Sequence, residues 1–451
     1  MVLPEIGAMM QTAEEVKILE QRLRYEQRAA IKSIEVTQEL QVLQTRTVSL
    51  EEVKRDLQSW IEPFQKEVEM LTKGPVTRMS RRDYERLRSQ GVEAEILPTK
   101  MVATVKPPGK RKGRIVVCGN YAGDKAEDTS VGGICAVALR GAVHKAAAEG
   151  WSMATVDVKG AFLQAPRRTK EKVSLVQPPG LLIQMGLAEP GEVWQVHQAL
   201  YGYVESPADW GHFRDNEGLR KMEWEMDGVV YKLAATPEPH LWKIKKGDST
   251  EGLVLVYVDD FLITAPESIK DAVLNAISKT WECSPPEQIT AKEWVRYCGY
   301  EIKAKAEGGF MVRQTNYIQD IVDRRKIQGE EAVPLPKIED DDDEVNPDIG
   351  TIREAQGLVG ELMWISGRSR PDLGYGVSFL SRMIHRRPGY VCKLAQHMLK
   401  FLNKSKEQAL HFRKLQPGKE EEMSAWVDAS FAPPHEGWRW AMEATSSCGI
   451  R

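Results

Sequence analysis

The chain has 451 residues, of which 42% are hydrophobic and 28% are charged, enough for several domains of roughly 100–200 residues each. No apolar run approaches the ~20 residues of a membrane-spanning helix, and residues 1–20 lack the apolar stretch of a secretory signal, so we expect neither. The six cysteines form no C-x-x-C pair, which argues against a zinc knuckle or a disulfide framework. We therefore expect an intracellular protein, cytoplasmic or nuclear.

The formal net charge of −3 averages over two basic regions. Residues 73–114 contain 12 Lys and Arg against 4 Asp and Glu, and residues 368–404 contain 8 against 1. Each region could be a solvated surface, the commoner case for a charge cluster. Two basic regions offset by acidic stretches also indicate a protein that binds phosphate groups locally.

Two helices are predicted near the N-terminus. Residues 12–45 contain neither Gly nor Pro and are rich in Glu, Gln, Lys, Arg and Leu, which predicts a long helix. It is either a short coiled coil or a helix docked on the main body, and we favour the second. Residues 49–71 predict a further helix with one apolar face that packs inward. This face consists of Leu57, Trp60, Ile61, Phe64 and Val68.

A β-hairpin is predicted over residues 97–117, where apolar and polar residues alternate on both sides of a Pro-Pro-Gly turn. Its tip, residues 109–114, reads Gly-Lys-Arg-Lys-Gly-Arg and is expected to be a flexible basic loop. The tip is either solvated or a clamp whose Lys and Arg side chains close over phosphate oxygens. An Ala-rich helix over residues 133–149 follows, with Gly150 as its C-terminal cap.

Two predicted strands carry carboxylates into apolar surroundings. Residues 153–163 predict a strand that ends near Asp157, and residues 254–263 predict a hairpin with Asp259 and Asp260 at its turn. An Asp at a strand end is usually a helix cap, and turn aspartates usually point into water. The alternative is a divalent-metal site, because Mg²⁺ prefers carboxylate oxygens and nucleotidyl transfer uses two metals about 3.5–4 Å apart.

The second half of the chain predicts two amphipathic helices, over residues 316–326 and 355–367. Between them, residues 339–344 read Glu-Asp-Asp-Asp-Asp-Glu, with prolines on both sides. Such a run can bind cations but is far more often a solvated linker, so we expect a domain boundary here.

These segments resemble the polymerase core of a copia-type LTR-retrotransposon Pol polyprotein, a reverse transcriptase followed by a ribonuclease H domain. Tyr-Val-Asp-Asp at residues 257–260, preceded by Asp-Val-Lys-Gly-Ala-Phe-Leu at residues 157–163, carries the resemblance. Each motif is short, but their common order is specific. The further matches, in the family's order, are residues 112–116, 200–210, 297–302 and 370–382.

The resemblance implies an α+β fold of the right-hand polymerase type, with fingers, an antiparallel palm sheet and a thumb. Residues 48–335 would form the fingers and palm, residues 336–347 an acidic linker, and residues 348–420 the thumb and connection. Residues 1–47 would be a helical extension that could form a coiled coil, and residues 421–451 a truncated ribonuclease H-like start.

The resemblance also implies an RNA-directed DNA polymerase that extends a DNA primer on an RNA template with deoxynucleoside triphosphates. Asp157, Asp259 and Asp260 would be catalytic and would hold two Mg²⁺ ions, for which Mn²⁺ can substitute. One ion would help deprotonate the primer 3′-hydroxyl and the other would neutralise the triphosphate. The other implied residues are Lys112, Arg114, Phe162 and Glu205 for nucleotide binding, and Gly299 and Tyr300 for the primer grip.

Two of the implied nucleotide-binding residues, Phe162 and Glu205, each allow more than one interpretation. Phe162 lies where the family places an aromatic that crowds a ribose 2′-hydroxyl and selects deoxynucleotides, and a core aromatic is an equally good interpretation. Glu205 stands where the family has a Gln that contacts the incoming nucleotide. A carboxylate there would repel a triphosphate unless it is paired or protonated, so the departure predicts impaired activity.

The C-terminal residues 425–430 resemble the first strand of ribonuclease H, with Asp428 as its first metal ligand. Only 23 residues follow Asp428, so we expect no working ribonuclease H. The protease triplet Asp-Ser/Thr-Gly is also missing, which predicts one piece of a polyprotein or a truncated genomic copy. The alternatives to a polymerase are a catalytically silent remnant that only binds nucleic acid and an interaction protein built on residues 12–45. The oligomeric state stays open.

Overall fold

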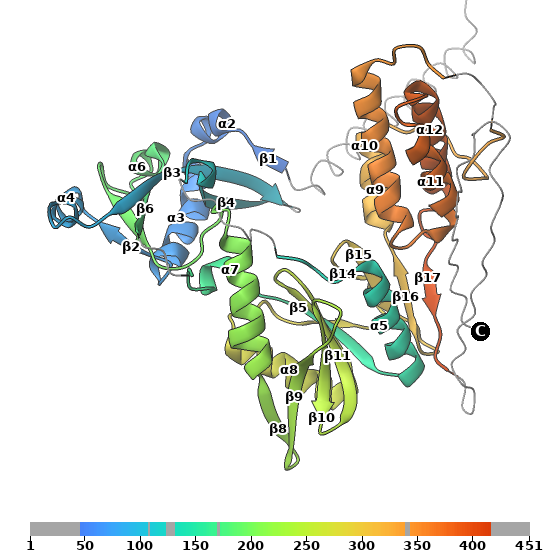
Figure 1. The fold of residues 1–451 in the computed structure, drawn as a ribbon, viewed down its shortest axis with the longest axis horizontal. Helices are drawn as coiled ribbons and strands as arrows, with labels where there is room; N and C mark the ends of the chain where they lie inside the picture. The colour runs from blue at the N-terminus through green and yellow to red at the C-terminus, as the bar shows by residue number, and fades with distance from the viewer. Residues whose placement is uncertain (1–45, 107–108, 123–130, 169–171, 339–342, 416–451) are drawn as a thin grey trace, which may run out of the picture. The chain divides into compact units, whose positions relative to one another are not determined.

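The computed structural model divides into two compact units (Figure 1). Unit 1 consists of Met1–Thr129 and Phe162–Trp210, and unit 2 of Ser130–Ala161 and Gly211–Arg451, so the two units alternate along the chain. The structure describes residues 46–106, 109–122, 131–168, 172–338 and 343–415.

Several predicted features lie outside the described residues. These are the helix or coiled coil over residues 12–45, the acidic residues 339–342, and the ribonuclease H-like residues 425–430 with Asp428. Within the described ranges, no helix is long and apolar enough to cross a membrane.

Unit 1 is built on a six-stranded mixed sheet. β3 is 13 residues long and joins its two halves, because residues 94–98 pair in parallel with β6 and residues 99–106 pair antiparallel with β4. In sheet order the strands are β1 (Arg46–Val48), β3 (Ala94–Lys106), β6 (Val173–Gln177), β7 (Val193–Val196) and β2 (Val76–Met79), with β4 (Lys110–Val117) paired to β3. The helical segments of this unit and its borders are α2 (Leu50–Arg55), α3 (Gln58–Thr72), α4 (Arg81–Ser89), η1 (Gly119–Tyr121), η2 (Ala161–Gln164), α6 (Gly180–Gln184) and α7 (Ser206–His212).

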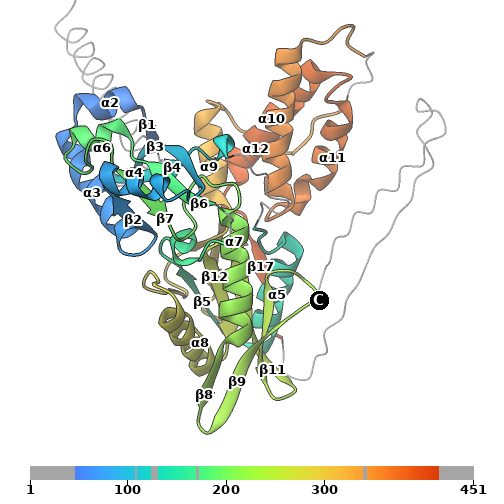
Figure 2. The same cartoon turned by 60° about the vertical axis from the view of Figure 1, so that its left-hand side comes forward.

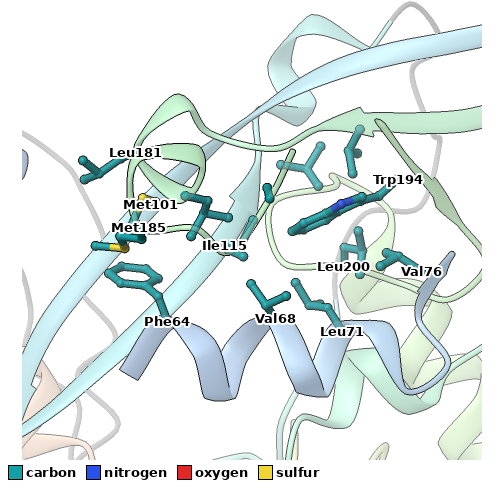
Figure 3. Close-up of a cluster of buried hydrophobic side chains, with 14 of the residues drawn as sticks. Phe64, Val68, Leu71, Val76, Met101, Ile115, Leu181, Met185, Trp194 and Leu200 are labelled. Atoms are coloured by element: carbon teal, nitrogen blue, oxygen red, sulfur yellow. The ribbon is translucent and has the colours of Figure 1, made fainter. Parts of the chain in front are cut away.

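Helix α3 packs its predicted apolar face into the core of unit 1. Phe64, Val68 and Leu71 point from the helix toward the cluster that contains Ile115 and Trp194 (Figure 3). All five side chains are buried. The apolar face predicted for residues 49–71 is therefore confirmed.

The single helix predicted over residues 49–71 was wrong, because the chain forms two helices, α2 and α3, that are separated at Asp56. Asp56 leaves the helical conformation with φ −126° and ψ 51°. Its carboxylate accepts the Ser59 hydroxyl at 2.7 Å and pairs with Arg111 Nη2 at 3.1 Å. A short polar side chain that finds local partners in this way competes with helix continuation.

The predicted hairpin over residues 97–117 is confirmed as β3 and β4. The expectation of a basic loop at residues 109–114 was wrong from Lys110 onward, because these residues belong to β4. Gly113 accounts for the ordered strand: a Cβ there would lie 2.6 Å from Cδ1 of Phe64, so only glycine lets the strand approach α3 this closely. Pro107 and Pro108 lie outside the described residues.

Unit 2 contains a seven-stranded antiparallel sheet. One face packs on α5 (Ala136–Glu149), with Leu255 and Leu262 in their common core, and Gly150 ends α5 at φ 69° as predicted. On the other face Phe261 stacks on Trp281, just after α8 (Glu267–Thr280), with ring centroids 5.7 Å apart. In sheet order the strands are β13 (Glu287–Ile289), β5 (Ser152–Asp157), β12 (Asp260–Ala265), β11 (Ser249–Tyr257), β10 (Leu241–Lys246), β9 (Val229–Ala235) and β8 (Glu223–Met226).

The remainder of unit 2 combines a four-stranded sheet with a group of helices that share one buried core. The predicted helices over residues 316–326 and 355–367 correspond to α9 and α10. α10 begins earlier than predicted because Asp348 caps it, accepting the Thr351 N–H at 2.9 Å. The elements are β14 (Val295–Tyr297), β15 (Tyr300–Ala304), β16 (Phe310–Arg313), α9 (Thr315–Arg324), α10 (Ile349–Ser366), η5 (Pro371–Leu373), α11 (Gly374–Met383), α12 (Pro388–Ser405) and β17 (Leu410–Phe412).

Candidate active site

The hairpin of β11 and β12 carries the Asp259-Asp260 pair at its turn, as predicted. Tyr257 lies opposite Asp260 in the register, so Val258 and Asp259 are the two turn residues. Val258 has a φ of 56°, which a β-branched residue rarely adopts and which costs about 1–3 kcal/mol. Contacts from outside the hairpin must therefore hold this turn.

β5 lies next to β12 in the sheet (Figure 2). This pairing sets Asp157, the last residue of β5, beside the turn. The register sets Asp157 opposite Asp260, and directly opposed residues of antiparallel strands point to the same face of the sheet. The end of β5 is fixed by two backbone hydrogen bonds, from Val158 N–H to Asp259 O at 3.0 Å and from Ser284 N–H to Asp157 O at 2.8 Å. The fold thus brings together the three carboxylates that the sequence singled out.

These carboxylates oppose one another's ionisation. Burial, followed by the charges of Asp259 and Asp157, raises the pKa of Asp260 to about 7. A divalent cation would offset this repulsion, and the oxygen donors suit Mg²⁺. Within the described ranges, no group of three or more His, Cys, Asp or Glu side chains is already arranged to hold a metal ion.

Two of the predicted nucleotide-binding residues, Arg114 and Phe162, both contact the ring of Tyr201 in unit 1. Arg114 and the predicted residue Lys112 lie on the face of β4 opposite its buried residues. The Arg114 guanidinium lies 5.1 Å from the centroid of the Tyr201 ring, and the Tyr201 ring lies 5.9 Å from the Phe162 ring. Both aromatic side chains are half-buried. The structure therefore brings Arg114 and Phe162 together around Tyr201.

Glu205, which departs from the family pattern, is buried. Its Oε1 lies 3.7 Å from Nη2 of Arg167, whose side chain is also buried. The same guanidinium lies 4.2 Å from the centroid of the Tyr203 ring. The two opposite charges form an ion pair, although Nη2 of Arg167 makes no hydrogen bond to the described residues. Pairing is one of the two conditions under which a carboxylate here would not repel a triphosphate, and the structure meets it.

The residues predicted for the primer grip lie at the turn between β14 and β15. Tyr297 pairs with Tyr300, and both turn residues have positive φ, 48° at Cys298 and 77° at Gly299, as in a type I′ turn. Gly299 is exposed, whereas Tyr300 is buried. Burial raises the pKa of Tyr300 to about 12. Gly299 thus presents backbone at the surface, while the Tyr300 side chain packs inside.

Glu301, next to this turn, anchors the fold. The Glu301 carboxylate accepts the Asn316 N–H at 2.6 Å and the Arg313 Nε–H at 3.0 Å, which joins β15 to the start of α9. The glutamate of this motif is therefore explained by structure alone.

Arg370, in the matched segment 370–382, is a second anchor. It donates to both carboxylate oxygens of Asp372 and, at 3.1 Å, to the carbonyl oxygen of Ser405 at the end of α12. These contacts join the segment after α10 to the last helix of its core.

A comparison with known protein families shows to which family the chain belongs. A family described as reverse transcriptase (RNA-dependent DNA polymerase) matches residues 86–339, a range that contains all three carboxylates. The chain belongs to the reverse transcriptase family. Its fold is accordingly a reverse transcriptase domain of mixed helix and sheet content.

Related sequences place this reverse transcriptase among Ty/copia-type retrotransposon proteins, which confirms the predicted resemblance. It is 23% identical over 287 residues to a putative transposon Ty5-1 protein of Saccharomyces cerevisiae, covering 62% of this chain and 85% of the yeast protein. It is 25% and 26% identical to retrovirus-related Pol polyproteins from transposons RE1 and RE2 of Arabidopsis thaliana. Those matches cover 62% of this chain and 18% of each polyprotein.

Solved structures similar to this reverse transcriptase include two telomerases. The match to telomerase from Candida tropicalis has a TM-score of 0.26 at 10% identity and covers 55% of this chain and 58% of the other. The match to telomerase from Candida albicans, in complex with a fragment of telomeric RNA, has a TM-score of 0.31 at 8% identity and covers 77% and 65%. Scores this low add nothing to the family assignment.

Sequence reasoning missed two residues near the predicted site of this reverse transcriptase. Tyr201 lies in the matched segment 200–210, but nothing in the segment indicated that its ring contacts both Arg114 and Phe162. Arg214 forms part of no recognised motif, although it contacts the carboxylate turn. Only the folded arrangement identifies either residue.

Proposed function

We propose that the chain is an RNA-directed DNA polymerase that transfers deoxynucleotides to a primer 3′-hydroxyl with the help of two divalent ions. The observation that carries the proposal is the register of β5 and β12, which sets Asp157 opposite Asp260 and beside the Asp259 turn. Carboxylates from separate strands that converge at one sheet edge are what two-metal nucleotidyl transfer requires.

In this proposal the elements take the parts of a right-hand polymerase. Unit 1 corresponds to the fingers, the seven-stranded sheet to the palm, and α9 to α12 to the thumb. Because α9 packs in the same core as α10 to α12, the thumb would begin at α9, ahead of the boundary expected at residue 348.

The chemistry assigned to this chain's residues is mainly positioning and charge compensation. Asp157, Asp259 and Asp260 would hold two Mg²⁺ ions, with Mn²⁺ as a substitute. When bound, such ions lower the pKa of the attacking hydroxyl and neutralise the triphosphate.

Substrate recognition is proposed for residues of unit 1 and for the turn at Gly299. Lys112 and Arg114 would bind the triphosphate of the incoming deoxynucleotide, since their cationic groups lie on the exposed side of β4. Phe162, held against Tyr201, would exclude a ribose 2′-hydroxyl. The exposed backbone of Gly299 would contact the DNA primer.

Single-nucleotide incorporation on a primed RNA template in Mg²⁺ tests the proposal. The wild-type chain should extend the primer, and Asp157→Asn and Asp259→Asn should each abolish extension because they remove a metal-binding charge. Asp248→Asn is the matched control, since Asp248 is an exposed carboxylate at the far end of β11. Salt-sensitive RNA binding without incorporation, even in Mn²⁺, would overturn the proposal and favour a silent nucleic-acid-binding remnant.

A further inference from the structure

Arg214 is a buried cation close to the carboxylate turn. It lies in the π-helix η3 (Phe213–Gly218), which follows α7, and its side chain is fully buried. Nε and Nη2 donate to the Asp215 carboxylate at 2.7 and 3.1 Å. A buried guanidinium is tolerated only when its charge is paired, and Asp215 supplies the opposite charge.

A second contact of Arg214 reaches the turn itself. Its Nη1 donates to the carbonyl oxygen of Val258 at 2.9 Å. Val258 is the turn residue with φ 56°, and its carbonyl directly precedes Asp259. The next carbonyl, that of Asp259, accepts the Val158 N–H at 3.0 Å. Two consecutive carbonyls of the turn are therefore held, one by Arg214 and the other by the end of β5.

His240 completes the surroundings of the guanidinium. Its Nδ1 lies 3.1 Å from Nη2 of Arg214, and its carbonyl oxygen accepts the N–H of Val256 in β11 at 2.9 Å. Burial, followed by the charge of Arg214, lowers the pKa of His240, so its ring is neutral and its Nδ1 can accept a hydrogen bond. Arg214 is thus held by Asp215 from its own helix and by His240, which precedes β10 and is bonded through its carbonyl oxygen to β11.

We infer that Arg214 is a positioning residue that holds the strained Val258-Asp259 turn in the conformation from which Asp259 and Asp260 bind divalent metal. The inference rests on the proposed function, because it assigns Arg214 a role at that same metal site. A hydrogen bond from a group fixed on two sides offsets the unfavourable φ of Val258. Groups that orient metal ligands commonly affect metal affinity about 10–100-fold.

A purely structural role for Arg214 gives a different expectation. A buried pair with Asp215 alone would change the stability of unit 2 but not the affinity of the folded chain for metal. The contact to Val258 predicts a loss of affinity that depends on strain in the turn. Replacing Val258 by asparagine, which tolerates positive φ, should therefore reduce the need for Arg214.

Mn²⁺ binding to the full chain, followed by the electron paramagnetic resonance signal of free Mn²⁺, tests the inference without measuring turnover. Binding at this site is the difference between the wild-type chain and Asp259→Asn. We expect Arg214→Gln to raise the Kd for Mn²⁺ at this site by about tenfold or more. Adding Val258→Asn to Arg214→Gln should restore most of the affinity. Arg220→Gln is the matched control, because Arg220 is an exposed arginine on the same segment.

Arg214→Lys guards against failure to fold, since it keeps a positive charge beside Asp215 but lacks the planar set of donors that reaches Val258. It should also weaken Mn²⁺ binding. Wild-type affinity in Arg214→Lys, or in a folded Arg214→Gln, would overturn the inference and leave the proposed function intact. A weakened Arg214→Gln that Val258→Asn does not rescue would also overturn it. A wild-type chain that binds no Mn²⁺ at the carboxylates would overturn both.

Discussion

The replacement Glu67→Gln is expected to stabilise unit 1 above neutral pH. Glu67 lies on the buried face of α3 with 4% of its surface exposed, and its Oε1 accepts the Ile115 N–H at 3.2 Å. Burial raises the pKa of Glu67 to about 7, although the Ile115 hydrogen bond and the charges of Lys112 and Arg114 act in the opposite direction. The carboxyl group is therefore protonated in the folded chain below neutral pH.

The sign of the effect follows from proton linkage. In the unfolded chain Glu67 ionises near its ordinary pKa of 4.5, so the folded chain binds the proton more tightly. The stability gained in this way is fully present below about pH 4.5 and is lost as the pH rises through about 7. The whole shift corresponds to about 3 kcal/mol. Gln resembles the protonated carboxyl and can keep the hydrogen bond to Ile115, so the variant should not suffer this loss.

Urea unfolding at pH 5 and pH 8, followed by tryptophan fluorescence, measures the difference. Between these pH values the wild-type chain should lose about 2 kcal/mol more than Glu67→Gln. Other titrating groups are common to both chains and cancel in the comparison. Glu69→Gln is the matched control, because Glu69 is exposed on the same helix, and it should behave like the wild type. Identical pH dependence in the wild type and Glu67→Gln would refute the reasoning.

Two further substitutions test the packing of β4 against α3 and the ion pair of Glu205 with Arg167. Gly113→Ala sets a methyl group 2.6 Å from the Phe64 ring and should lower the free energy of unfolding by about 1–3 kcal/mol. The control is Gly141→Ala, because a Cβ at Gly141 would meet no atom within 4 Å, and it should raise the free energy of unfolding by about 0.5–1 kcal/mol. Similar small changes in the free energy of unfolding for both variants would mean that β4 can move away from α3. Glu205→Gln removes the negative partner of the buried Arg167 and should destabilise by about 3 kcal/mol in thermal unfolding. An unchanged melting temperature with faster nucleotide incorporation would instead mean that Glu205 repels the triphosphate.

The carboxylate site could be read from the sequence because its signals are local. Asp157 ends an apolar run, and Asp259 with Asp260 interrupts another. The pattern of each strand therefore predicts the position of its carboxylates. Their convergence was a hypothesis from the chemistry of two-metal sites and from the family resemblance, and the register of β5 and β12 agrees with it. Such patterns predict local structure correctly because they depend only on residues that are close in the sequence.

Features that depend on contacts between distant residues could not be read in this way. The break at Asp56 involves Arg111, and the order of β4 at Gly113 depends on the ring of Phe64. The neutralisation of Glu205 needs Arg167 from an earlier segment of the chain. No periodicity or spacing records such pairs, so the sequence alone predicted a continuous helix and a loop, and it left open whether Glu205 is paired or protonated.

The alternation of the two units along the chain has a consequence for how the protein is made. β6 reaches its parallel partner β3 only after the chain has passed through Ser130–Ala161, which belongs to unit 2. The β5 strand in that excursion obtains its partner β12 only after the rest of unit 1 has been synthesised. In each sheet, two paired strands are therefore separated along the chain by a segment that belongs to the other unit. Pairings between such distant segments form slowly. A single cut directly after β5 would leave two fragments, each lacking strands of both sheets, so the two units are expected to fold as one cooperative event rather than one after the other.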